Sequence, residues 1–160
     1  MGPNRKYLNP LIAFAILGLS VQLVTTQALS FEQRTVCELL KSPKRFTGRL
    51  VSVRAEMIAV RDFALVDPTD RRCGVLASAF PEDPEVTPNP GFTMLRDKNY
   101  DELQQAFPIL RTTPSGTRGS IVATIEGRFD WTPRGSGHMQ LRRTRLVWHR
   151  VLDIVVIPPR

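Results

Sequence analysis

The sequence LVSVRAEM, residues 50–57, alternates between apolar and mainly polar side chains. The apolar set on one side of this alternation is Val51, Val53, Ala55 and Met57. A period of two residues is typical of a β-strand that buries one face. We therefore expect a strand from Leu50 to Val60 whose apolar face contributes to the core.

Four other segments also have the composition of strands, because β-branched and aromatic residues are frequent in them and turn residues bound them. They are residues 63–66, 74–80, 120–131 and 139–157. Gly127 lies inside the third of these segments, where a glycine permits a bend. The last segment ends at Pro158 and is expected to form one long strand or a bent pair of strands.

Two short helices are expected. The segment Thr35-Val36-Cys37-Glu38 has the form of a capping box, which satisfies free amides at the start of a helix. It predicts a helix from Val36 to about Lys41, ended by Ser42-Pro43. A second helix is predicted from Tyr100 to Phe107, with Asn99 as its N-cap and Pro108 at its end. The proline- and glycine-containing residues 81–97 and 108–119 are expected to be irregular loops.

The order of these elements is a helix, three strands, a second helix and two strands. This is the order of an OB-fold, a small Greek-key barrel. We therefore predict a mostly β protein, a five-stranded OB-like Greek-key barrel with a short N-terminal helix and a helix between strands 3 and 4. Barrels of this kind have many unrelated functions, so the fold alone predicts no activity.

Several residues carry a resemblance that agrees with this fold. They are Cys37-Glu38-Leu39-Leu40, Pro43, Phe46, Gly48, Val51, Val53, Glu126-Gly127-Arg128-Phe129 and Gly137-His138. In these positions the chain resembles a group of exported, largely uncharacterised bacterial proteins that are OB-like. The resemblance covers most of the chain after residue 30 and implies a fold, not an activity.

The first thirty residues have the pattern of an export signal. Arg5 and Lys6 precede an apolar run from Leu11 to Val24, and the small residues Ala28 and Ser30 follow it. The run is shorter than the roughly twenty residues that span a bilayer, which favours cleavage over retention as a membrane anchor. We expect residues 1–30 to be a signal peptide and residues 31–160 to be one periplasmic or secreted domain without a stable membrane span.

The chain is basic, with 22 Lys and Arg against 15 Asp and Glu and a net charge of +7. Loss of Arg5 and Lys6 with the leader lowers this charge to +5. Arginine-rich surfaces favour phosphate, sulfate or carboxylate partners. The alternative is that the positive charge serves solubility alone.

The two cysteines, Cys37 and Cys73, are even in number and 36 residues apart. In an oxidising compartment this predicts one disulfide. Two buried free thiols are the alternative, because sequence spacing does not show that the Cα atoms come close enough.

An OB-like barrel binds ligands across strands 2 and 3, beside the loop after strand 1 and the loop between strands 4 and 5. The candidate ligand-binding residues are therefore Arg61, Phe63, Arg71, Arg72, Trp131, Arg134 and His138. Aromatic rings flanked by guanidinium groups suit a base with its phosphate, or a sugar with an acidic substituent. Trp131 has an alternative role, which is to close the end of the barrel.

The last strand carries a run of arginines. Alternation sends Arg143 and Arg145 to one face and Arg142 and Arg150 to the other, so the four do not form one patch. At least one pair is expected to be solvated or to pair with Glu126 or Asp130 on the neighbouring strand.

Catalytic motifs are lacking. His138 and His149 do not have the spacing of a zinc site, and the chain has no nucleophile elbow, phosphate loop or dinucleotide motif. We expect no metal, no cofactor and no enzymatic activity; a hydrolase would require one of these histidines beside a carboxylate in a pocket.

The expected function is binding of an anionic or polar ligand in the periplasm or cell envelope, such as an anionic oligosaccharide, a nucleic acid or an envelope protein. The alternative is a structural or protein–protein interaction module of the envelope with no small ligand.

Overall fold

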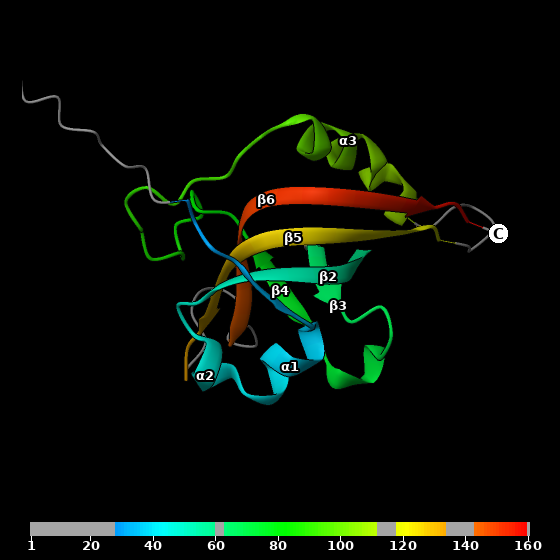
Figure 1. Cartoon of the computed structure of the whole chain (residues 1–160). Coiled ribbons are helices and arrows are strands. Elements are labelled where there is room, and N and C mark those ends of the chain that lie inside the picture. Colours follow the sequence, from blue (N-terminus) through cyan, green and yellow to red (C-terminus); the bar gives the residue numbers. More distant parts are fainter. Residues whose placement is uncertain (1–27, 60–62, 112–117, 134–142, 160) are drawn as a thin grey trace, which may run out of the picture.

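The computed structural model describes residues 28–59, 63–111, 118–133 and 143–159. Its elements are β1 (Glu32–Arg34), α1 (Val36–Lys41), α2 (Pro43–Phe46), β2 (Leu50–Ala59), β3 (Phe63–Val66), the 3₁₀ helix η1 (Arg71–Cys73), β4 (Leu76–Ala79), α3 (Lys98–Ala106), the 3₁₀ helix η2 (Phe107–Leu110), β5 (Ser120–Trp131) and β6 (Thr144–Ile157). The protein is mostly β, with α1 and α2 at one end of the sheet and α3 beside β6 at the opposite side (Figure 1).

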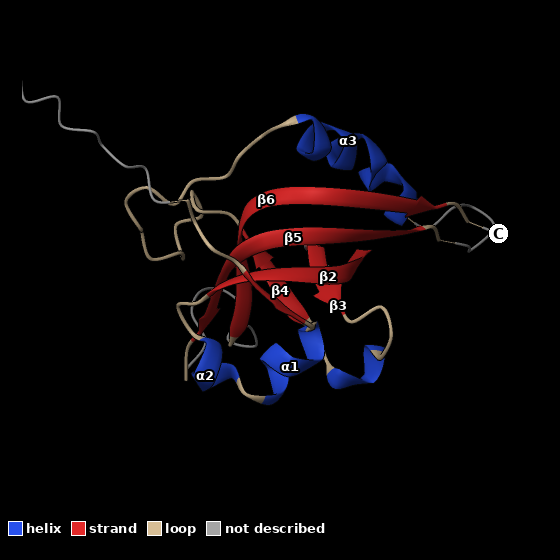
Figure 2. Ribbon diagram, viewed as in Figure 1, coloured by secondary structure: helices blue, strands red, loops and turns tan. Residues whose placement is uncertain are grey.

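Five of the strands form a closed barrel, seen in Figure 2. Its order is β2-β3-β4-β6-β5, and pairing of β5 with β2 closes it. The β4–β6 pair is parallel and the other pairs within the barrel are antiparallel. This mixed arrangement is consistent with the OB-like barrel that the sequence predicts.

The short strand β1 was not expected. It pairs in parallel with β2, with Glu32 opposite Val51 and Arg34 opposite Val53. β3 pairs only with the second half of β2, from Glu56 to Ala59, so β1 covers the edge that β3 leaves open. The three residues of β1 are all polar and have no strand pattern of their own. They are extended because they pair with the edge of β2.

The alternating stretch forms the strand that it predicts. In β2 the side chains of Val51, Val53 and Ala55 are fully buried and Met57 is 1% exposed. β3 and β5 also cover the predicted ranges, whereas β4 is shorter at both ends than the predicted segment. β6 begins at Thr144, and residues 139–142 of the predicted last strand lie outside the described residues.

The start of α1 has the capping box that its sequence predicts. The Thr35 hydroxyl accepts from the amide of Glu38 at 3.1 Å, and the Glu38 carboxylate accepts from the amide of Thr35 at 2.8 Å. A second short helix, α2, follows directly and begins at Pro43, because proline needs no N–H partner in the first turn.

The N-cap predicted for α3 is wrong. Asp97, not Asn99, caps the helix, and its carboxylate accepts from the amides of Asn99 and Tyr100. The Asn99 side chain instead donates to the carbonyls of Val151 at 3.1 Å and Leu152 at 2.7 Å, so it fastens α3 to the free edge of β6. The helix runs on beyond Ala106 as η2, with Pro108 inside the 3₁₀ turn.

The main core fills the barrel and includes Trp148, Phe129 and Leu65 among its largest fully buried side chains. A smaller apolar cluster, made of Ala79, Val86, Phe92 and Val147, lies beneath the irregular residues 81–97. Among the described residues, no helix is long and apolar enough to cross a membrane. Residues 1–27, which hold most of the predicted signal peptide, lie outside the described part of the chain.

Candidate functional site

A pocket of about 840 Å³ lies beside the barrel strands β3, β4 and β6, bounded by η2, the end of α3 and residues 83–86. Its size is within the roughly 300–1,000 Å³ of small-molecule sites. Part of it involves strands 2 and 3 of the predicted barrel, here β3 and β4, where the OB-like arrangement places ligands.

Aromatic rings form much of the pocket wall. Phe63 of β3 stacks on Phe107 of η2, with ring centroids 4.1 Å apart and 19° between the ring planes. Phe80, just after β4, lies 5.5 Å from the indole of Trp148 in a tilted geometry. The wall is therefore rigid and apolar, and it suits a flat apolar group.

Two buried polar atoms belong to residues that line this pocket. The indole Nε1 of Trp148 and the hydroxyl of Ser78 have no hydrogen-bond partner within the described part of the chain. Trp148 is only 1% exposed. Buried polar groups are nearly always satisfied, and an unsatisfied one costs roughly 1–3 kcal/mol. The unpaired donor and the unpaired hydroxyl therefore both belong to residues that border the pocket.

The strand geometry explains why these two side chains come together. Ser78 lies opposite Leu146 in the parallel β4–β6 pair, and Trp148 follows two residues along β6. Successive side chains at even spacing share one face of a strand. The pairing of β4 with β6 therefore brings residues 78 and 148, which are far apart in sequence, to the same pocket.

The charged side chains at the pocket balance one another. Asp83, Glu85, Arg111 and Arg145 contribute two carboxylates and two guanidinium groups to the lining. The Asp83 carboxylate accepts from the amide of Phe80 at 2.6 Å. Arg145 lies 3.8 Å from Asp130, one of the two carboxylates expected to pair with the arginine run. The lining has no strong preference for an anion.

Of the four candidate residues that the structure describes, only Phe63 lines this pocket. Arg71 has a different partner: its guanidinium group binds the Glu56 carboxylate through two hydrogen bonds, of which the Nε–Oε2 bond is 2.8 Å long. Arg72 is 94% exposed and pairs with Asp70 at 3.3 Å. Arg61, Arg134 and His138 lie outside the described residues.

Trp131 is remote from Arg71 along the barrel. Glu56, which binds Arg71, lies opposite Val122 on β5, whereas Trp131 is at the far end of the same strand. At about 3.3 Å per residue, the two points are roughly 30 Å apart along the strand. The structure therefore does not join these two described candidates into one site. Trp131 packs against the core at the end of the barrel, the alternative role considered for it.

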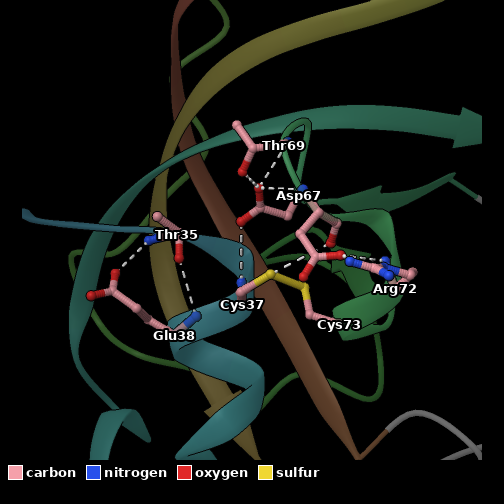
Figure 3. The surroundings of a disulfide bond; sticks show 8 residues. Thr35, Cys37, Glu38, Asp67, Thr69, Arg72 and Cys73 are labelled. Carbon is pink, nitrogen blue, oxygen red and sulfur yellow. Dashed lines mark hydrogen bonds and ion pairs between the residues drawn. A yellow bond between two sulfur atoms is a disulfide. The ribbon is translucent and has the colours of Figure 1, made fainter.

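Figure 3 shows the surroundings of the disulfide between Cys37 and Cys73, whose Cα atoms are 5.4 Å apart. The predicted disulfide is present. It joins the first turn of α1 to η1. Among the described residues, Cys37, Asp67 and Cys73 are the only cluster with the composition of a metal site, and the disulfide occupies both of its sulfur atoms.

Asp67 fixes the turn beside this disulfide. One carboxylate oxygen accepts from the amide and hydroxyl of Thr69 and the amide of Asp70, and the other accepts from the amide of Cys37 at 3.4 Å. Burial raises the pKa of Asp67, but the hydrogen bonds, led by the Thr69 hydroxyl, outweigh burial and hold the pKa below its ordinary value. Asp67 is therefore a structural carboxylate.

Arg150 has a partner that the sequence did not indicate. It donates to the Asp97 carboxylate at 2.9 Å, and this hydrogen bond is the main reason that the pKa of Asp97 is lowered. The two arginines of β6 that the structure describes therefore lie on different faces of the strand. Arg150 is on the side of α3, and the buried Arg145 lies beside Asp130.

His149 lies between aromatic rings, and within the described part of the chain it has no carboxylate partner. Its Nδ1 atom is 2.7 Å from the carbonyl oxygen of Thr93, and its ring is 5.5 Å from that of Phe31 and 5.2 Å from that of Phe92. These contacts hold the start of the described chain and the irregular segment 81–97 against β6. The arrangement is structural.

Sequence reasoning missed Ser78 and Trp148. Ser78 is one small residue in an Ala-Ser-Ala strand, and nothing local marks it as a site. Trp148 offered a weak signal, because a buried indole N–H usually requires a partner. Comparisons of the chain with family models, with curated protein sequences and with solved structures found no match.

Proposed function

We propose that this chain is an exported, non-enzymatic OB-like module that binds a small polar ligand in the pocket beside Trp148. The observation that supports this proposal is a pair of buried, unsatisfied polar atoms, Trp148 Nε1 and Ser78 Oγ, on two residues that line a pocket of about 840 Å³. Export rests on the sequence pattern of residues 1–30.

The chemistry of the two atoms defines the ligand. An indole N–H only donates, and a hydroxyl both donates and accepts. The ligand therefore carries an acceptor oxygen near Trp148. Its remaining surface is apolar, to match the rings of Phe63, Phe80 and Phe107. The balanced charges of the lining favour a polar ligand over a strongly anionic one.

The absence of enzymatic activity is part of the proposal. A hydrolytic site needs a general base beside the reacting group. Among the described residues, His149 has a carbonyl partner, stacks on Phe31 and makes a tilted contact with Phe92, and it is not part of the pocket lining. Of the two carboxylates that line the pocket, Asp83 is engaged with the amide of Phe80 and Glu85 is exposed to solvent.

The test is a fluorescence titration with 6-propionyl-2-dimethylaminonaphthalene, a neutral probe with apolar rings and an acceptor carbonyl oxygen. W148F keeps an aromatic ring and removes the N–H donor, so binding weakens about fivefold, the equivalent of one hydrogen bond of ~1 kcal/mol. S78A removes the hydroxyl without opening a large cavity and gives a similar loss. Circular dichroism checks that both variants stay folded.

The matched control is W131F, the same substitution at the far end of the barrel. It leaves the titration unchanged, because Trp131 contacts Lys44 and Thr47 and does not line the pocket. Equal losses in W148F and W131F, or unsaturable binding of the probe to the native chain, would refute the pocket as the ligand site.

A second candidate function is that of an interaction module of the envelope. The observation that favours it is the exposed apolar end of β6, formed by Leu152, Val155, Val156 and Ile157, which are 38–46% exposed. Patches of this kind often mark protein contacts. This alternative predicts that V155K changes the sedimentation of the chain at micromolar concentration while probe binding is absent in all variants.

A further inference from the structure

The end of the barrel at α2 carries exposed cations with no carboxylate partner. We define the basic end as Lys44, Arg45, Arg49 and Arg143 around Trp131. These four cations are exposed, and none has an ion pair to a carboxylate in the part of the chain that the structure describes. The segment from residue 39 to residue 55 contains no Asp or Glu.

Contacts between α2 and the end of β5 bring together the chain segments that carry these cations. The amide of Trp131 donates to the Thr47 hydroxyl at 2.8 Å, and Lys44 Nζ is 5.5 Å from the centroid of the Trp131 ring. Arg49 lies shortly after α2, beside the same end of β5, since its carbonyl oxygen accepts a hydrogen bond from the amide of Phe129 at 2.9 Å. The Arg143 carbonyl accepts from Thr132 at 2.9 Å, next to Trp131.

Two carboxylates on strands of this sheet already have arginine partners. Asp130 accepts two hydrogen bonds of 2.9 Å from Arg128, and Glu32 pairs with Arg34. Both therefore neutralise their own arginines rather than the basic end. The local field is positive, and it attracts an anionic partner.

We infer that the basic end docks on the surface of an anionic phospholipid membrane. Trp131 favours this partner over a sugar or a nucleobase, because Lys44 lies over one face of its ring and leaves less of the ring free for a stacked ligand. A half-buried indole beside Lys and Arg side chains is suited to a headgroup region, where aromatic and basic residues both gather.

The basic end is also separate from both pockets described for this protein. Neither the pocket beside Trp148 nor the groove beside residues 88–94 includes any side chain of the basic end. Figure 1 places α2 and the adjacent end of β5 together, away from α3. Docking here leaves the Trp148 pocket, which is lined by other residues, free for a ligand.

The experiment is co-sedimentation of the full chain with vesicles of phosphatidylcholine, alone or mixed with phosphatidylglycerol. K44Q/R45Q weakens binding to the mixed vesicles about 25-fold, since each cation near an anionic surface contributes roughly fivefold. R49Q/R143Q gives a second, independent pair of substitutions at the same end. All variants share residues 1–30, so a difference between them reports on the basic end.

The matched control is R96Q/K98Q, which removes the same charge beside the start of α3. Because Arg96 and Lys98 are exposed and lie away from α2, this variant keeps native binding. Native binding falls as salt rises through about 0.15 M, where the Debye length is ~8 Å. The Trp131 emission shifts to shorter wavelength on the mixed vesicles, and W131F removes the shift.

Three results would overturn the inference. The first is equal binding to vesicles with and without phosphatidylglycerol. The second is equal loss in K44Q/R45Q and R96Q/K98Q, which would indicate a response to net charge alone. The third is binding to an acidic oligosaccharide or single-stranded DNA that depends on Lys44 and Arg45 and is tighter than binding to the mixed vesicles, which would assign the surface to a soluble polyanion.

Discussion

The ion pair between Arg71 and Glu56 can be tested by substitution, because the sequence predicts a ligand-binding role for Arg71 and the structure gives it a carboxylate partner. As a ligand-binding residue, Arg71 could be replaced without loss of stability. In the structure its guanidinium group binds both oxygens of the Glu56 carboxylate. The Glu56 side chain is only 6% exposed, whereas that of Arg71 is 66% exposed.

The magnitude of the effect follows from this asymmetry. Removing one partner of a fully buried pair costs roughly 3–5 kcal/mol, and an exposed pair contributes roughly 0–1 kcal/mol. Solvent screens the exposed Arg71, so we expect R71Q to lower the free energy of unfolding by about 1–2 kcal/mol. E56Q/R71Q leaves no buried charge and recovers part of that loss.

The assay is urea unfolding of the native chain, R71Q, E56Q and the double variant at pH 7, analysed as a double-mutant cycle. The neighbouring R72Q is the control. Arg72 is 94% exposed, and its loss changes the free energy of unfolding by less than about 0.5 kcal/mol. A coupling energy near zero between residues 56 and 71, or equal effects of R71Q and R72Q, would refute the structural role of the pair.

Three further perturbations test other parts of the fold. Replacing both Cys37 and Cys73 by Ser lowers the free energy of unfolding by about 4 kcal/mol in the chain-entropy estimate for their 36-residue separation, measured by urea unfolding. D67N costs roughly 1–3 kcal/mol at pH 7. Because the folded-state pKa of Asp67 lies below its ordinary value of 3.8, the stabilisation is complete above about pH 4 and is lost as the pH falls through the folded-state pKa, so D67N shows a flatter fall in melting temperature there. G127A costs roughly 1–3 kcal/mol by thermal unfolding, because its Cβ would lie 2.5 Å from the carbonyl oxygen of Val147.

Each of these expectations has a result that contradicts it. Unchanged stability of the serine variant in the absence of reductant would mean that the disulfide does not constrain the chain. Parallel pH profiles of native and D67N proteins below pH 4 would remove Asp67 as the source of the acid response. For G127A the control is G91A, where Gly91 has a positive φ but no atom lies within 4 Å of the new Cβ. A larger loss of stability in G91A than in G127A would contradict the close approach of β6 to Gly127.

Local patterns predicted the parts of the fold that local interactions determine. The alternation in residues 50–57 predicted β2 and its buried face, since a period of two residues is a property of any extended strand. Thr35 and Glu38 predicted the start of α1, because both partners of the capping box lie within one turn. Cys37 and Cys73 predicted their disulfide because no other pairing exists.

Contacts between distant segments decided the rest. Asp97 caps α3 in place of Asn99, since the edge carbonyls of Val151 and Leu152 take the Asn99 side chain. Arg71 faces Glu56, a residue 15 positions away on another element. Neither the N-cap of α3 nor the partner of Arg71 can be predicted from the residues that are close to it in the sequence.

A mostly β chain, its principal strands, the cap of α1 and the disulfide could all be predicted from the amino-acid sequence, because each depends on neighbouring residues or on a count of cysteines. The pairing of β1 with β2 and the ion pair of Arg71 with Glu56 arise from contacts across the folded chain. The same is true of the pocket that Ser78 and Trp148 line and of the cation-bearing segments next to Trp131. Barrel closure places β4 beside β6 and α2 beside β5, and this register depends on the whole chain and not on any one segment of it.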